Sequence, residues 1–301
     1  MSNQAKPNFF IVGAARSGTS SLYEYMRQHP DIFLCNPKEP MYFAFPEQRV
    51  NFSGPGDDLE INAKAVTSLQ MYLALFQGAK QKALGEASAN YLYSATAPKT
   101  IAKFSPNAKL IAVLRNPVDR AYSSYLYTLR DGRETATSFE QALELEQKRI
   151  ADNWEHLWHY SEMGFYFEQI KRYLEYFPEQ QIKIILQEDL KKDTGRVLRE
   201  VFEFLDVDPN FEPEIGLEYN QGGQPKFALL NSILTRPSKF KQWIRPFLPR
   251  FLLNAVIALK HKNLSKPDME DETRKMLVDL YRKDIESLEK LIGRGLDGWM
   301  S

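Results

Sequence analysis

The stretch that decides the fold is Phe9-Phe10-Ile11-Val12-Gly13-Ala14-Ala15-Arg16-Ser17-Gly18-Thr19-Ser20-Ser21-Leu22. A short apolar run, typical of a buried strand, leads directly into a loop of small residues that opens a helical pattern. Small residues let the backbone curl around an anion, and the free N–H groups at the helix start point toward it. The stretch therefore predicts a strand, a phosphate-binding loop and a helix.

This loop departs from the one that binds ATP or GTP. The spacing from Gly13 to Gly18 matches the nucleotide phosphate loop, but Thr19 stands where a Lys would reach the β- and γ-phosphates. The positive charge lies on Arg16 instead, inside the loop. The residues expected to bind the donor here are Arg16, Ser17, Gly18, Thr19 and Ser20.

A second anion site is predicted after the apolar run Leu110–Leu114. Arg115 follows that strand at once, and Pro117 suits the first position of a helix. Ser123 lies about two turns further along this helix. A guanidinium beside a hydroxyl suits a phosphate monoester, so Arg115 and Ser123 are candidate ligands of a second phosphate.

The rest of the chain alternates in the same way and predicts the α/β class, with a parallel β-sheet flanked by helices. A further buried strand is expected at Ile182–Leu186 and a weaker one before Gly85. Helices are expected around Thr19–Arg27, Ala97–Phe104, Pro117–Arg130, Phe139–Lys148, Phe165–Phe177, Gly195–Leu205 and Met269–Ile292. In the last helix, the core-facing stripe is predicted at Met276, Leu277, Leu280, Ile285, Leu288 and Leu291.

The amino-acid composition limits the classes of binding partner that the chain can have. The chain has 301 residues, 43% of them hydrophobic, with 39 basic and 39 acidic side chains. This balance provides no global field for nucleic acid or a membrane, so any anion site is local. The single cysteine, Cys35, excludes an intramolecular disulfide, and the N-terminus lacks a signal-peptide pattern, so a cytoplasmic protein is expected.

The two loops together resemble those of the PAPS-dependent sulfotransferases, where PAPS is 3′-phosphoadenosine-5′-phosphosulfate. The likeness is greatest to the heparan sulfate branch and its bacterial relatives. Residues 10–22 resemble the family's 5′-phosphosulfate loop, and residues 114–123 resemble its 3′-phosphate motif. The resemblance implies one sulfotransferase domain over residues 1–301, with the P-loop nucleotide-kinase-like sulfotransferase fold.

The resemblance also implies further site residues. Glu86, in Gly85-Glu86-Ala87-Ser88-Ala89-Asn90-Tyr91, matches the strand end that carries the catalytic carboxylate. Lys38 belongs to a Lys-Glu-Pro loop found in many bacterial members. Gly223 and Lys226 match a loop that closes over the 3′-phosphate. The chain departs from the family pattern at three positions: Arg16 replaces a Lys, Met41 replaces a His, and Ala87 replaces a Lys.

Together these residues imply an in-line transfer of a sulfuryl group to an acceptor hydroxyl or amine. Glu86 is the expected base, and Arg16, with help from Lys38, is expected to stabilise charge on the sulfonate. No metal is expected. His156 and His159 lie three apart without a carboxylate at ligand spacing, which favours an exposed helix face over a metal site.

Two alternatives stay open. A small-molecule kinase that uses ATP and Mg²⁺ would share the phosphate loop, although the strand Leu110–Leu114 ends in Arg115 instead of an acidic metal ligand. A membrane-associated binding module would use the basic-apolar stretch Arg236–Lys262. We expect residues 228–266 to form a lid or substrate cap instead, and residues 36–58 to form a long ordered loop. A glycan is the expected acceptor, with a lipid or acyl hydroxyl as the alternative, and oligomeric state is left open.

Overall fold

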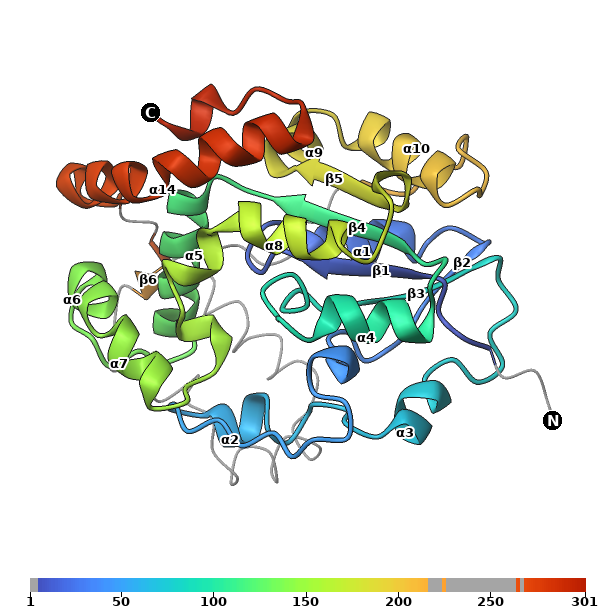
Figure 1. Cartoon of the computed structure of the whole chain (residues 1–301), viewed down its shortest axis with the longest axis horizontal. Helices are drawn as coiled ribbons and strands as arrows, with labels where there is room; N and C mark the ends of the chain where they lie inside the picture. The colour runs from blue at the N-terminus through green and yellow to red at the C-terminus, as the bar shows by residue number, and fades with distance from the viewer. Residues whose placement is uncertain (1–4, 216–223, 226–263, 266–267) are drawn as a thin grey trace.

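The computed structural model describes residues 5–215, 224–225, 264–265 and 268–301. Its centre is a five-stranded sheet in the order β2-β3-β1-β4-β5, and every pairing is parallel. The strands are β1 (Phe9–Gly13), β2 (Ile32–Leu34), β3 (Ala83–Ala87), β4 (Lys109–Leu114) and β5 (Ile182–Leu186). The predicted fold class, a parallel sheet between helices, is therefore confirmed (Figure 1).

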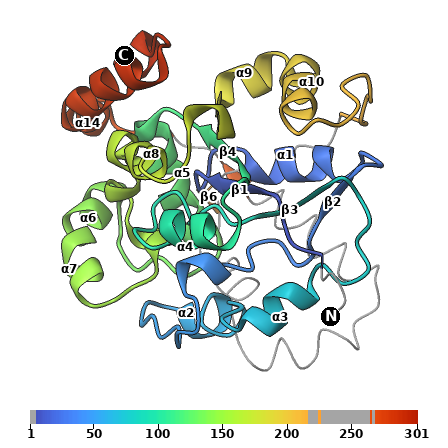
Figure 2. The same cartoon turned by 45° about the vertical axis from the view of Figure 1, so that its right-hand side comes forward.

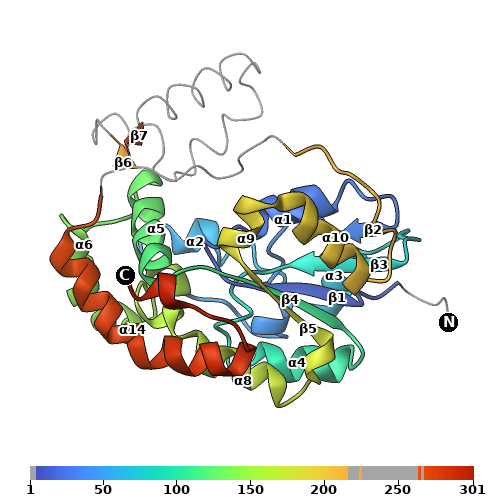
Figure 3. The same ribbon diagram turned by 90° about the horizontal axis from the view of Figure 1, so that it is seen from above.

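One face of the sheet is covered by α1 (Thr19–Met26), α9 (Gln187–Lys192) and α10 (Thr194–Phe204), as Figure 3 shows. Side chains alternate along a strand, so every second residue points to this face. Phe9, Ile11, Ile111 and Val113 accordingly pack into the cluster that contains the buried side of α1 and α10. Both faces of the central strands are therefore apolar, as a doubly covered parallel sheet requires.

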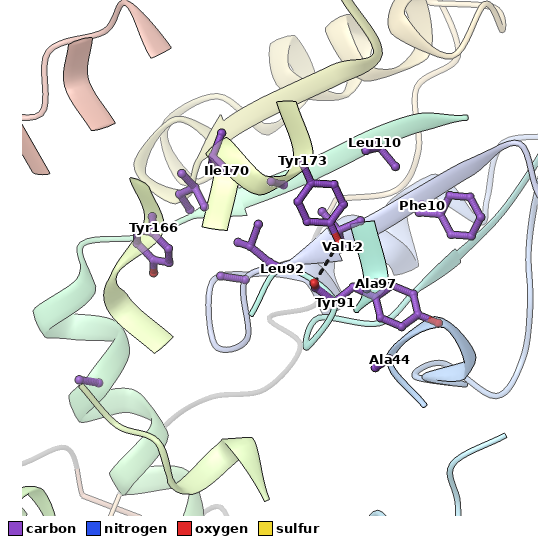
Figure 4. Close-up of a cluster of buried hydrophobic side chains, with 14 of the residues drawn as sticks. Phe10, Val12, Ala44, Tyr91, Leu92, Ala97, Leu110, Tyr166, Ile170 and Tyr173 are labelled. Carbon is purple, nitrogen blue, oxygen red and sulfur yellow. Dashed lines mark hydrogen bonds between the residues drawn. The ribbon is translucent and has the colours of Figure 1, made fainter. Parts of the chain in front are cut away.

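The opposite face is covered by α4 (Ala97–Phe104) and α8 (Tyr166–Leu174), as Figure 3 shows. The helices α5 (Pro117–Arg130) and α14 (Asp271–Ile292) contribute buried residues to the same apolar cluster, and α14 packs against α8 and α5. Phe10 and Val12 point into this second cluster, together with Tyr91 and Tyr173. The hydroxyl of Tyr173 donates to the carbonyl of Tyr91 at 3.0 Å, so α8 is joined to the segment that follows β3 (Figure 4).

The predicted stripe of α14 was wrong at two positions. Met276 and Leu280 are 52% and 47% exposed, whereas Val278 and Tyr281 are buried beside Leu277, Ile285 and Leu288. The buried set repeats at intervals of three and four residues from Leu277, which is the spacing of one helix face. Met276 and Leu280 lie about 100° from that face and point away from the core.

The remaining described helices lie outside these layers. They are α2 (Asp57–Glu60), α3 (Leu69–Ala74), α6 (Phe139–Glu144) and α7 (Glu146–Ala151), and Figure 2 shows α6 and α7 beside α5. Short 3₁₀ turns occur at Tyr42–Ala44 (η1), His156–Trp158 (η2), Glu162–Gly164, Glu179–Gln181 and Asp297–Trp299, and a short antiparallel pair joins β6 (Gln224–Pro225) to β7 (Leu264–Ser265). Within the described ranges, no helix has both the length and the apolarity needed to cross a bilayer.

The strand order predicts where a ligand binds. After β1, the chain builds β2 and β3 on one side of it and β4 and β5 on the other. In open parallel sheets, ligands bind beyond the carboxyl ends of the strands where the order reverses in this way. The carboxyl ends of β1, β3 and β4 meet at that point. Arg16 and Arg115 follow β1 and β4, and Glu86 is the penultimate residue of β3.

Candidate active site

The loop after β1 is shaped for a bound anion. Gly18, the N-cap of α1, has φ 102°, a left-handed conformation that glycine adopts without a steric penalty. The N–H of Ser17 donates to the carbonyl of Ala14 at 3.3 Å, which folds the loop back on itself. The first N–H groups of α1 have no helical acceptor and are available to a ligand.

Arg16 is the charged residue of this loop. Its guanidinium stacks on the ring of Tyr127 at 4.5 Å, and its buried Nε has no hydrogen-bond partner among the residues described. Burial, with smaller contributions from the charges of Arg130 and Arg115, lowers the pKa of Arg16 to about 10. Arg16 is therefore still cationic at neutral pH. A buried cation with an unpaired donor is expensive, and an anionic ligand would offset that cost.

Arg115 connects the second predicted anion site to the first. The side chain of Asn116 caps α5 by accepting from the N–H of Val118 at 2.9 Å, which fixes the helix start beside the end of β4. From there, Nη1 of Arg115 donates to the backbone carbonyl of Arg16 at 3.2 Å. Ser123 lies two turns along α5 and is partly exposed. Burial lowers the pKa of Arg115 as well.

Glu86 is placed differently from Arg16. It pairs with Phe10 in the sheet register and is 0% exposed. Its Oε1 accepts from the hydroxyls of Tyr72 and Tyr91 at 2.9 and 2.8 Å, and its Oε2 accepts from Ser88 at 2.7 Å. Burial raises the pKa of Glu86 to about 7, although the three hydroxyls act in the opposite direction.

Lys38 and Glu39 bring the Lys-Glu-Pro loop to the end of β3. The two side chains form an ion pair. Glu39 Oε2 also accepts from the N–H of Ala89 at 2.8 Å, and its own N–H donates to the carbonyl of Ala87 at 2.9 Å. Lys38 is therefore held near the donor loop by backbone contacts made by its neighbour.

A pocket of about 290 Å³ brings these segments together, a volume near the lower end for small-molecule sites. Four of the candidate site residues, Arg16, Thr19, Ser20 and Lys38, line it, whereas Arg115 and Ser123 are not among its lining residues. Glu86 does not line it in this state. Gly223 and Lys226 fall outside the described residues, as do most of 228–266 and the stretch Arg236–Lys262. The other residues that line the pocket are Ala15, Glu39, Met41, Ala89, Asn90, Tyr127, Glu155, His156, Leu157 and Met163.

Sequence reasoning missed part of this wall and misjudged another part. Asn90 was noted only as part of the Glu86 motif, and Tyr127 and Glu155 were not singled out. The interpretation of His156 and His159 as an exposed helix face was wrong. They lie in and just after the 3₁₀ turn η2 and pack edge to face, with ring centroids 5.4 Å apart. His159 is only 6% exposed, and His156 lines the pocket.

The comparisons with known proteins agree with this geometry. The model of the sulfotransferase domain family matches residues 6–216, which is more than half of the chain. The chain belongs to the sulfotransferase family. Sulfotransferases of this family use PAPS as the sulfuryl donor. Within the described part of the chain, no three His, Cys, Asp or Glu side chains are grouped as metal ligands.

This sulfotransferase resembles proteins of two kinds. It is 27% identical over 309 residues to the human bifunctional heparan sulfate N-deacetylase/N-sulfotransferase 3, and 27% identical over 313 residues to mouse enzyme 4 of the same name. Each match covers 98% of this chain and 31% of the relative, so the chain spans about a third of the length of these relatives.

A solved sulfotransferase from Alicyclobacillus acidocaldarius is similar over the full length. The two are 35% identical, and the match covers 99% of this chain and 100% of that one, with a TM-score of 0.78. The sulfotransferase domain from the curacin biosynthetic pathway has the same fold at 20% identity and a TM-score of 0.51.

Proposed function

We propose that this sulfotransferase moves the sulfuryl group of PAPS to a hydroxyl or amine of a glycan. The observation that carries the donor half is the pair of guanidinium groups at the ends of neighbouring strands, Arg16 after β1 and Arg115 after β4. A ligand with two separated anionic groups fits two such cations better than a single phosphate does.

Each loop has its own part in donor binding. The N–H groups of Ser17–Ser20 and the side chain of Arg16 hold the phosphosulfate end, while Arg115 and Ser123 hold the 3′-phosphate. The unpaired buried Nε of Arg16 supports this assignment, because it gains a partner when an oxyanion is bound. Gly223 and Lys226 belong to this proposal through the family resemblance.

The transfer is an in-line displacement at sulfur. The acceptor oxygen or nitrogen forms a bond to sulfur, the bond from sulfur to the donor's phosphate oxygen breaks, and 3′-phosphoadenosine-5′-phosphate (PAP) leaves with that electron pair. Arg16 and Lys38 stabilise the charge that develops on the sulfonate and on the leaving oxygen. The acceptor proton passes to a general base.

Glu86 is the proposed base. Its pKa of about 7 suits proton transfer near neutral pH, because a base works best with a pKa near the operating pH. Its three hydroxyl donors keep the carboxylate in place, and one of them, Ser88, also accepts from the N–H of Met41 in the pocket wall at 3.0 Å. Because Glu86 is 0% exposed, the proposal requires the backbone around Met41 to move aside so that the acceptor can reach the carboxylate.

The glycan acceptor has two supports. The curated relatives are named as heparan sulfate enzymes. The pocket is lined by both polar and apolar side chains, including Asn90, Glu155 and Leu157. A lipid or acyl hydroxyl is the competing acceptor class. Its larger apolar part would need more apolar side chains in the lining of the pocket.

The direct experiment incubates the protein with PAPS labelled on sulfur and a panel of glycan, lipid and phenolic acceptors. Label in glucosamine-containing oligosaccharides, dependent on PAPS and independent of Mg²⁺, is the expected result. If every acceptor stays unlabelled, the proposed activity is wrong. If only the lipid or phenolic acceptors take up label, the glycan assignment is wrong and the donor assignment stands.

A further inference from the structure

One wall of the pocket carries polar side chains that the donor does not need. Asn90 lies in the segment between β3 and α4, and His156 begins η2, 66 positions later. Both line the same pocket as Arg16. They come from segments distant in sequence, so their shared place in the pocket wall results from the tertiary fold.

Both side chains have unused hydrogen-bonding capacity. Asn90 is 8% exposed, and neither its Nδ2 nor its Oδ1 has a partner within the described ranges. Nδ1 of His156 is also buried and unpaired there. An unmade hydrogen bond at a buried polar group is destabilising, so three such atoms in the residues that line one pocket wall point to a polar ligand.

The neighbouring His159 shows what a structural histidine looks like at this position. Its Nδ1 lies 3.0 Å from the hydroxyl of Tyr93, and its Nε2 lies 3.3 Å from the carbonyl of Trp154, so both ring nitrogens are used. Edge-to-face contacts to Tyr93 at 5.1 Å and to Phe52 at 5.4 Å hold the ring of His156. These rings fix its orientation and leave Nδ1 without a hydrogen-bond partner among the described residues.

We propose that Asn90 and His156 form the acceptor subsite and hold the attacking hydroxyl or amine opposite Arg16. This inference rests on the proposed function and assigns the acceptor side of the same pocket. The amide of Asn90 offers one donating and one accepting group, and His156 offers an accepting nitrogen. The class of acceptor that uses all three carries a hydroxyl or amine with a second polar group beside it, as an amino sugar does. A simple phenol does not.

His156 acts as a positioning residue, not as the base. Burial, with a smaller contribution from the neighbouring His159, lowers the pKa of His156 to about 3. At pH 7 the neutral imidazole can accept a hydrogen bond from the hydroxyl or amine that receives the sulfuryl group. It is too weak a base to retain the proton of that group. Glu86, with a pKa of about 7, is the better proton acceptor, so the two residues have separate tasks.

The test compares His156→Phe, which keeps an aromatic ring, and Asn90→Ala with the unchanged protein. We expect each to raise KM for a glucosamine oligosaccharide about 10-fold, the effect of losing one hydrogen bond to a positioned polar group. We expect the affinity for PAP, measured by calorimetry, to stay the same. In the double variant, KM should rise by less than the product of the two single-variant increases, because both residues hold the same ligand.

Further measurements separate the other outcomes. With 4-nitrophenol as acceptor, which has no second polar group beside its hydroxyl, KM should rise less in both variants than it does with the oligosaccharide. His156→Gln, which keeps an accepting group, should recover part of the lost affinity for the oligosaccharide. Asn210→Ala, at an exposed position, is the control for Asn90→Ala and should change neither constant.

The proposal is overturned if folded Asn90→Ala and His156→Phe keep the KM of the unchanged protein, or if they lose PAP affinity instead. If His156→Phe does not fold, Asn90→Ala decides. A failure of the proposed function looks different, because the unchanged protein would then neither bind PAP nor transfer label.

Discussion

The guanidinium of Arg115 donates to the backbone carbonyl of Arg16 at 3.2 Å, and this bond ties the end of β4 to the loop after β1. The cation proposed for the 3′-phosphate thus helps to shape the loop proposed for the phosphosulfate. Binding at one end of the donor is therefore expected to depend on both arginines.

Arg115→Ala should weaken PAP binding. Losing a charge-assisted hydrogen bond costs about 1.5–3 kcal/mol, which corresponds to about 10- to 100-fold in the dissociation constant. Calorimetric titration with PAP measures it. Arg196→Ala, whose arginine is paired with Glu200 on the surface, is the control and should bind PAP normally. Equal affinities in the two variants would contradict the role of Arg115.

Arg16→Lys should keep PAP binding but slow transfer. The charge remains, whereas the flat stack on Tyr127 and the Nε donor are lost. We expect kcat to fall about 10-fold, and further in Arg16→Ala, because a lysine cannot reproduce the planar fork. Steady-state rates at saturating acceptor measure this. A Lys variant as fast as the original would mean that charge alone is needed.

Glu86→Gln should abolish turnover while PAP still binds. The amide keeps the size of the side chain and an acceptor for its hydroxyl partners, but it cannot take up a proton. Single-turnover transfer of labelled sulfuryl and PAP titration measure the two properties. Glu272→Gln, at an exposed position of α14, is the matched control. Transfer at the original rate by Glu86→Gln would remove Glu86 from the mechanism.

Glu86 should also make stability depend on pH. Its pKa rises from the ordinary 4.5 to about 7 on folding, so between these values the folded state binds more protons than the unfolded state. The free energy of unfolding should therefore decrease as pH rises through this window, by about 3 kcal/mol in total from this group. Urea denaturation at pH 5 and pH 8 measures the decrease. The decrease should be smaller in Glu86→Gln, and an equal decrease would contradict the pKa.

Asp57 should be the most important residue for holding the pocket wall in place. It is 0% exposed, forms an ion pair with Arg133, and accepts from the N–H groups of Gly54 and Glu155 at 2.8 and 2.9 Å. Asp57→Ala should lower the free energy of unfolding by about 3–5 kcal/mol, because the buried Arg133 would keep only the longer ion pair with Glu155 and two backbone N–H groups would lose their acceptor. Asp58→Ala, one residue on and exposed, should change it little. Similar losses in both would contradict the assignment.

The sequence predicted the layers of this fold well and its small elements poorly. Two helices, Ala97–Phe104 and Pro117–Arg130, begin and end where predicted, because a proline in the first turn marks each start. The strand β2 was missed because three residues show no periodicity, and α9 was missed because its sequence is mostly polar. Helices α2 and α3 were also too short to stand out.

The residues of the candidate site also differ in whether the sequence alone could predict them. The candidate donor residues lie in the loops directly after two strands, so local motifs are enough to predict them. Asn90 and His156 meet only through the tertiary fold, and no local pattern marks a histidine whose nitrogens are unused. Glu86 was identified by its motif, but its burial under three hydroxyls depends on Tyr72 and Tyr91, which a motif does not reveal. The single-domain organisation and the cytoplasmic location stay predictions.

The identity of the donor is the central claim, and a thermal shift measurement tests it most directly. The protein is melted with PAP, with ATP and Mg²⁺, and without ligand. We predict that PAP raises the melting temperature, and more so at higher PAP concentration. ATP with Mg²⁺ should not raise it, because Thr19 stands where the lysine that contacts the ATP phosphates would be. Stabilisation by ATP and Mg²⁺ without any effect of PAP would contradict the account and favour a kinase.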